Sequence, residues 1–237
     1  MKINEHAAIL TPTLLLVPYS EHHVPTYHEW MQDEDLQKAT ASEPLTLPEE
    51  YAMQKSWRTD ADKLTFIVCN APPKDDIKLE AGKQDHTKAM IGDVNLFLYE
   101  GEDEDEEVEE KNIRERQKLV GEIEIMIARK DMQEKGFGKV ILLTFLWYIL
   151  LSVDEIVKEW NEHLGTKTVA SSLGYLRVKI GSENTRSIRL FEGVGFKKMS
   201  ETPNYFGELE LRWLISDESK SALEAKLANV PIVADYP

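Results

Sequence analysis

The chain has 237 residues, of which 42% are hydrophobic and 30% charged, and its formal net charge is -15. This length and hydrophobic share favour one embellished α/β domain with an ordinary core over two domains. The acidic balance, with a pI near 4.9, argues against a nucleic-acid partner, which requires a basic face, and fits a cationic substrate such as an amine better.

Cysteine usage and the N-terminal residues bear on the compartment. Cys69 is the only cysteine, which excludes an internal disulfide and a Cys-based zinc site, so we expect a reducing compartment, the cytoplasm or alternatively the nucleus. The first residues lack a basic stretch followed by a long apolar core, which predicts no secretory signal. The longest apolar run, 140–153, is shorter than the roughly 20 residues that cross a bilayer, so we expect a buried helix and no membrane partner.

Taken in chain order, the first half of the sequence alternates strand-like and helix-like segments. Residues 14–18 form an apolar run ended by proline, and helical spacing follows over 24–31. Thr46 precedes Pro48 and two acids, which predicts a capped helix to about residue 57. Segments 64–69 and 89–98 are rich in β-formers and predict paired antiparallel strands, while 71–88 and the acidic run 102–110 read as solvated loops.

Residues 119–128 form the most informative predicted strand, because its side chains alternate between two faces. One face carries Ile123, Ile125 and Ile127, and the other carries Glu122, Glu124 and Met126. A glycine-containing turn leads from it to the apolar helix and then to the more polar segment 154–164. We then expect a strand at 176–180, a helix at 184–194, a last strand at 206–214 and, after residue 216, an amphipathic or loosely ordered tail.

The turn between that strand and that helix, 133–138, predicts a phosphate site. Glycines let successive N–H groups converge at the helix N-terminus, where the dipole favours an anion without basic side chains. Neither common rival fits, because Gly138 is followed by Lys139-Val140 rather than the Lys-Ser/Thr of a P-loop, and a dinucleotide loop requires a small residue where Ile141 stands. A plain glycine-containing turn is the remaining alternative.

Two signatures in this order resemble the GNAT superfamily. Gln133-X-X-Gly136-X-Gly138 is similar to its acyl-CoA loop, Arg/Gln-X-X-Gly-X-Gly/Ala, and 184–196 is similar to a second signature, in which an asparagine opens a helix that ends in Gly-Phe. Over residues 12–213 the chain resembles more narrowly the N-acetyltransferase-9-like family. The segments that carry this resemblance are 17–19, 27–31, 41–47, 51–54, 92–97 and 121–124.

The resemblance implies a fold and a reaction. The fold is of the α/β (α+β) class: a single GNAT domain over 1–237, with a mixed, mostly antiparallel twisted sheet flanked by helices, a core of about 12–215 and a tail at 216–237. The implied reaction is transfer of an acetyl group from acetyl-CoA, the cosubstrate, to a protein amine without a metal. The family is described as acetylating the N-termini of α- and β-tubulin, so the acceptor implied is an N-terminal α-amine, possibly tubulin's. The oligomeric state is not predicted.

The resemblance also implies which residues bind the cofactor. The backbone of the loop is expected to hold the CoA pyrophosphate, the strand edge to pair with the pantetheine amide, and Asn184 to bond the cofactor arm while capping its own helix. The loop residues are Gln133, Glu134, Lys135, Gly136, Phe137 and Gly138, and the edge residues are Met126, Ile127 and Ala128.

Glu122 and Glu124 are the catalytic candidates, as base or water relay, because they share the strand face beside the expected thioester. Solvent exposure or cross-strand pairing is the alternative for both, and Asp93 and Asn95 are lesser candidates. An α-amine of pKa ~8 demands a weaker base than a lysine of pKa ~10.4.

One position departs from the family pattern. Phe191 stands where many GNAT enzymes have a tyrosine that protonates the thiolate, so water, Tyr205 or no acid serves instead. This leaves open an inactive acetyl-CoA-binding interaction protein, as well as an enzyme for lysine or small-molecule acceptors. We expect no metal site, because the adjacent His22 and His23 should point in different directions.

Overall fold

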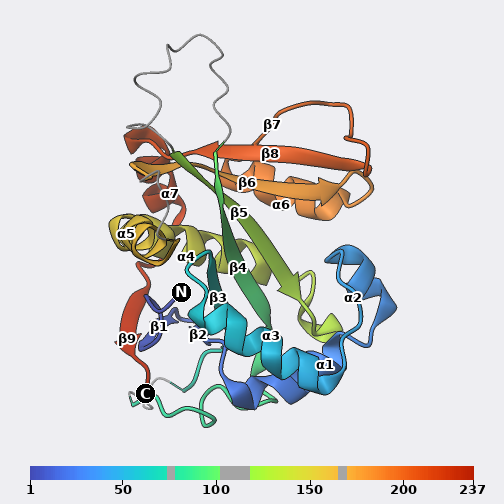
Figure 1. Ribbon diagram of the computed structural model, residues 1–237, viewed down its shortest axis with the longest axis vertical. Coiled ribbons are helices and arrows are strands. Elements are labelled where there is room, and N and C mark those ends of the chain that lie inside the picture. The colour runs from blue at the N-terminus through green and yellow to red at the C-terminus, as the bar shows by residue number, and fades with distance from the viewer. Residues whose placement is uncertain (74–77, 102–117, 165–169) are drawn as a thin grey trace.

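The computed structural model describes residues 1–73, 78–101, 118–164 and 170–237. Nine strands in these ranges form one sheet in the order β7-β8-β6-β5-β4-β3-β2-β1-β9, shown in Figure 1. The strands are β1 (Ala7–Leu10), β2 (Leu14–Pro18), β3 (Lys63–Asn70), β4 (Met90–Glu100), β5 (Lys118–Ile127), β6 (Ser172–Gly181), β7 (Lys197–Lys198), β8 (Glu208–Leu214) and β9 (Ile232–Asp235).

The helices lie on both sides of this sheet. They are α1 (Val24–Trp30), α2 (Glu34–Ala39), α3 (Leu47–Thr59), α4 (Phe137–Leu151), α5 (Val153–Leu164), α6 (Thr185–Val194) and α7 (Asp217–Lys226), with short 3-10 helices η1 (Glu21–His23) and η3 (Lys130–Met132). The predicted cap of α3 is present as a capping box, in which Glu49 Oε2 accepts from the hydroxyl and from the backbone N–H of Thr46, at 2.6 and 2.8 Å.

All neighbouring strands pair antiparallel except β5 and β6, which are parallel. The mixed, mostly antiparallel sheet flanked by helices is therefore confirmed. A parallel pair requires a crossover, and here the crossover carries α4 and α5 over one face of the sheet.

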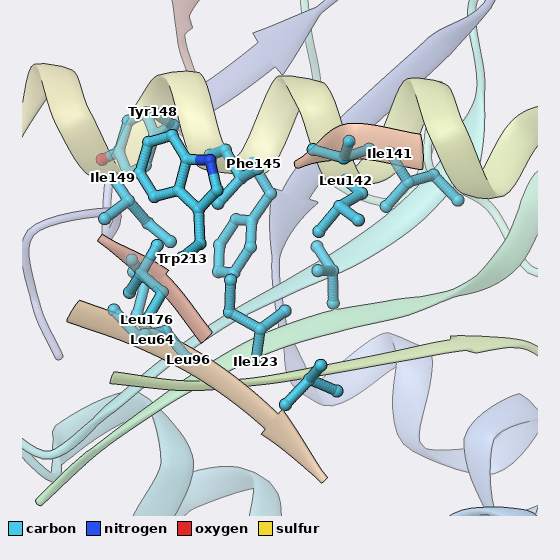
Figure 2. Packing of buried hydrophobic residues seen from close by; sticks show 14 of the residues in the cluster. Leu64, Leu96, Ile123, Ile141, Leu142, Phe145, Tyr148, Ile149, Leu176 and Trp213 are labelled. Carbon is cyan, nitrogen blue, oxygen red and sulfur yellow. The ribbon is translucent and has the colours of Figure 1, made fainter. Parts of the chain in front are cut away.

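Each face of the sheet has its own core. On one face α4 packs against alternating strand residues, and Figure 2 shows its Phe145 pointing toward Ile123 and its Ile149 toward Leu64, Leu96 and Leu176. The opposite face is covered by η1, α1 and α3. The predicted alternation of β5 is confirmed, since Ile123 belongs to the first core and Met126 to the second.

The apolar helix predicted at 140–153 is α4, and most of it is buried in the first core. In the described ranges no single helix has the length and hydropathy of a membrane span, and only α4 and α5 taken together reach them, with a bend of 68° between the two. Full burial of each Leu, Ile or Phe of α4 is worth about 1.5–3 kcal/mol.

Several elements were not predicted. The short α2, β1, β7 and β9 have too few residues for a periodic pattern. The segment interpreted as a tail contains α7, and β9 pairs antiparallel with β1 from Ala7↔Asp235 to Leu10↔Ile232, so the strand partner that orders it lies more than 200 residues away. The acidic run 102–110, expected to be a loop, lies outside the described residues.

Candidate functional site

The parallel strands β5 and β6 separate halfway along their length. Their register runs from Lys118↔Ser172 to Glu122↔Arg177 and stops there, whereas β5 stays paired with β4 as far as Ile127. Figure 1 shows the two strands diverging from that point. In the described part of the chain the edge of β5 from Ile123 onward therefore has no partner strand, and its backbone groups are free to bond an extended ligand.

The loop after β5 ends at an open helix N-terminus. Gly136 is the N-cap of α4 with φ of 84°, and among the described residues no side chain caps the first N–H groups of this helix. A Cβ atom at Gly136 would meet nothing within 4 Å, so the space over these donors is open. Unpaired N–H groups and the positive end of the helix dipole form an anion site.

Neighbouring side chains hold this loop in place. Gln133 Nε2 donates to the carbonyl of Ile127 at 2.8 Å. Arg186 of α6 forms an ion pair with Glu134 at 3.3 Å, and the backbone of Glu134 has φ of 61°. At Gly138 a Cβ atom would lie 3.1 Å from Leu190 Cδ2 of α6, so glycine permits this close contact. The loop residues predicted to bind a cofactor thus lie together as one loop, the predicted anion cradle, beside the free edge of β5 with Met126 and Ile127 and the following Ala128, and their contact with a cofactor stays a prediction.

On α6, Asn184 and Phe191 have separate structural roles. Asn184 Oδ1 accepts from the Ser187 N–H at 3.1 Å, so Asn184 caps its helix as expected, and its contact with a cofactor stays a prediction. Phe191 is only 1% exposed and stacks edge-to-face on Phe196 at 5.0 Å, so it belongs to the core. Tyr205, the alternative acid, is 96% exposed.

The two catalytic candidates on β5 have different surroundings. Glu122 Oε2 lies 2.7 Å from Arg177 Nε and 3.5 Å from Lys179 Nζ, so two cations of β6 hold this carboxylate. The cross-strand pairing considered for Glu122 is thus observed, which makes it a poorer candidate for proton transfer than Glu124.

Glu124 has no hydrogen-bond or ion-pair partner among the described residues. Partial burial of its carboxyl between the strands, together with the negative charges of Asp93 and Glu122, raises the pKa of Glu124 to about 7, although the side chain as a whole is exposed. This direction suits a group that exchanges protons near neutral pH.

The lesser candidates form a buried hydrogen-bonded group. Asp93 Oδ2 accepts from the Tyr27 hydroxyl at 3.1 Å and from Asn95 Nδ2 at 2.9 Å. Asp93 is 1% exposed, and burial raises its pKa to about 6 against the effect of these two bonds. Asn95 lies opposite Glu124 in the β4–β5 register, so two polar residues from different strands meet on one face.

The expectation that His22 and His23 point apart is wrong. Both Nε2 atoms lie near Asp85 Oδ2, at 2.9 and 3.1 Å, and the Tyr236 hydroxyl donates to the same oxygen. The 3-10 turn η1 curls the two rings to the same side, at 3.9 Å between centroids.

This arrangement does not fit a metal as it stands. His23 Nδ1 accepts the Ser20 N–H at 3.0 Å, so the proton of the neutral ring lies on Nε2, the atom that would have to coordinate the ion. A cavity of about 710 Å³ between α5 and the start of β6 lies away from the free edge of β5, since Lys118 on its wall is the first residue of that strand.

Comparison with known proteins places this geometry in a family. Residues 13–197 match the acetyltransferase (GNAT) domain. The chain is 42% identical to an N-acetyltransferase 9-like protein of Schizosaccharomyces pombe, over 89% of this chain and 97% of that protein. It is 37% identical to the alpha/beta-tubulin-N-acetyltransferase 9 of Homo sapiens, over 97% and 94%.

A solved structure has a similar fold at lower identity. The spermidine N-acetyltransferase of Vibrio cholerae, solved with CoA and spermine, aligns with a TM-score of 0.55 and 17% identity over 88% of this chain and 98% of its own. At that identity the likeness concerns the fold alone.

Proposed function

This chain belongs to the N-acetyltransferase 9-like family of GNAT acetyltransferases, and we propose that it transfers the acetyl group of acetyl-CoA to the N-terminal α-amine of a protein. That it is an acyltransferase follows from the family. The acceptor, the residue roles and a cytoplasmic location are the proposal. The alpha/beta-tubulin-N-acetyltransferase 9 relatives make tubulin N-termini the first acceptors to test.

The observation that carries the proposal is the parting of β5 from β6 beside the uncapped N-terminus of α4. The free strand edge offers N–H and C=O groups to the two amides of pantetheine, and the helix N-terminus offers donors to the pyrophosphate. Gln133 ties these two parts together through Ile127, so the cosubstrate would bind along one rigid path.

Glu124 is the proposed base of the reaction. The lone pair of the neutral amine attacks the thioester carbonyl carbon, the C–S bond breaks, a proton of the amine passes to Glu124, and the sulfur leaves as thiolate. A thiolate with a pKa near 8.5 leaves without an acid, which is compatible with a buried Phe191. Because an α-amine of pKa ~8 is roughly a quarter neutral near pH 7.4, a carboxylate with a pKa of about 7 suffices.

A second reading keeps the fold and the acetyl-CoA but not the reaction. Phe191 favours it, because it cannot give a proton and faces the core rather than the cleft. In this reading the protein is an acetyl-CoA-binding interaction protein.

Acetyl transfer from labelled acetyl-CoA to peptides tests the proposal. The peptides begin with Met-Arg-Glu-Ile, and matched peptides carry a blocked α-amine or add an internal lysine. We expect label only on free α-amines. Gly136→Asp, which adds a negative charge at the anion cradle, should abolish acetyl-CoA binding, while Gly193→Ala on α6, where a Cβ atom meets nothing within 4 Å, should retain it.

The outcomes separate the readings. Acetyl-CoA binding without transfer to any peptide would favour the interaction protein. Label on the internal lysine would contradict α-amine specificity while leaving acetyl transfer intact.

A further inference from the structure

A row of three polar side chains crosses the sheet from β3 in its interior to the free edge of β5. Thr65 on β3, Asn95 on β4 and Glu124 on β5 are direct partners in the antiparallel register, so their side chains share one face. Thr65 and Asn95 are 4% and 3% exposed, whereas Glu124 is exposed. Asn95 is therefore the buried neighbour of the proposed base.

Hydrogen bonding decides how the Asn95 amide is turned. Its Nδ2 donates to Asp93 Oδ2, an oxygen that also accepts from the Tyr27 hydroxyl. The carboxylate can only accept, so the amide nitrogen must face it and the amide oxygen must face away. In the described part of the chain that oxygen, Oδ1, receives no hydrogen bond although it is buried.

The surroundings are short of donors. Seven buried side-chain atoms lack partners among the described residues: Asn95 Oδ1, Asp93 Oδ1, Glu50 Oε2, Thr65 Oγ1, Tyr19 Oη, His28 Nδ1 and Arg58 Nη1. The first three are acceptors, and the two hydroxyls can supply one proton each. His28 Nδ1 lies 3.8 Å from Glu50 Oε1, beyond hydrogen-bond distance, and the Arg58 guanidinium bonds the Glu5 carbonyl at the end of α3. A ligand that brings N–H groups fits such a cluster.

Resting on the proposed function, we propose that Asn95 binds the acceptor amine through Oδ1, and that Asp93, held by Tyr27, is the positioning residue that turns the amide toward it. The acceptor nitrogen then uses one N–H for Asn95 and loses the other proton to Glu124, while its lone pair attacks the thioester. Only a primary amine has one N–H to donate to Asn95 and a second proton to give to Glu124. Asn95 and Glu124 together therefore select primary over secondary amines.

The test compares two enzymes on two peptides. Wild type and Asn95→Ala are assayed for kcat/KM on a Met-starting peptide and on the same peptide N-methylated at its α-nitrogen. We expect the wild type to prefer the primary amine by at least about tenfold, and Asn95→Ala to lose about tenfold or more on the primary amine but less than about threefold on the N-methyl peptide. Its affinity for acetyl-CoA should be unchanged.

Controls separate substrate binding from a structural role. Thr65→Val changes the same row one strand further in and should keep the wild-type preference. If Asn95→Ala does not fold, Tyr27→Phe removes only the bond that holds Asp93 and should reduce the preference at unchanged acetyl-CoA affinity.

Equal losses on both peptides, or an unaltered preference, would overturn the assignment of Asn95 while leaving the proposed function intact. If the wild type acetylated neither peptide nor any free α-amine, the proposed function would fail, and this inference with it.

Discussion

Replacing Asp93 by asparagine should change how the stability of the protein depends on pH. Asp93 is 1% exposed and has no cationic partner among the described residues, and burial raises its pKa from the ordinary value of 3.8 to about 6. The native protein therefore binds this proton more tightly than the unfolded chain does. The stabilisation from the protonated carboxyl is fully present below pH 3.8 and is lost as the pH rises through about 6.

The size of this loss follows from the two pKa values. At 1.36 kcal/mol for each pH unit between 3.8 and about 6, the wild type loses about 3 kcal/mol of unfolding free energy that an uncharged side chain would not lose. In Asp93→Asn the amide oxygen can still accept from Tyr27 and Asn95, and the new NH₂ group adds a cost that does not vary with pH. Only the pH-dependent part of the difference is therefore diagnostic.

Urea unfolding of wild type and Asp93→Asn from about pH 4 to pH 8 measures this pH-dependent difference in the free energy of unfolding. The free energy of unfolding of Asp93→Asn relative to wild type should rise by about 3 kcal/mol across this range, which corresponds to about 6–12 °C in Tm for a chain of this size. Asp35→Asn on the exposed surface of α2 is the control for loss of one negative charge. Parallel curves for wild type and Asp93→Asn would refute the argument that an ionised carboxylate is buried at this position.

Two further predictions concern the chemistry. Glu124→Gln should lower kcat/KM by about 10²-fold or more and remove the rise in kcat/KM around pH 7. Glu122→Gln should keep that rise and move it to lower pH, because a negative charge beside Glu124 is lost. The reverse pattern would make Glu122 the base. Phe191→Tyr should not raise kcat. It should lower the free energy of unfolding, measured in urea, by about 1–3 kcal/mol, because the new hydroxyl enters the core beside Phe196. A faster enzyme would show that the side chain at this position faces the thiolate.

Much of the fold was predictable because its elements are long and periodic. The alternation over 119–128, the apolar run of α4 and the Thr46 capping box each depend on neighbours along the chain. The turn at 133–138 and the start of α4 were predictable for the same reason, since the glycines and the helix that follows them set this conformation locally, while binding of an anion there stays a prediction.

The site residues were harder, because their roles depend on partners from other elements. Glu122 and Glu124 look equivalent in the sequence, and the difference between them comes from Arg177 and Lys179, which reach only the first of them from β6. The pairing of His22 and His23 with Asp85 was missed for the same reason, because the 3-10 turn that aligns the rings and the loop that brings Asp85 leave no periodic signal.

By itself the sequence determined the order of the long strands and helices, the glycine-containing turn between β5 and α4, and the family, because these rest on local backbone preferences and on the spacing of side chains along one segment. Only the tertiary structure decided where β5 leaves β6, which glutamate stays unpaired and that Asp93 accepts hydrogen bonds from both Asn95 and Tyr27. Burial, cross-strand register and the charges of other elements set these properties, and none of them is a property of a single segment.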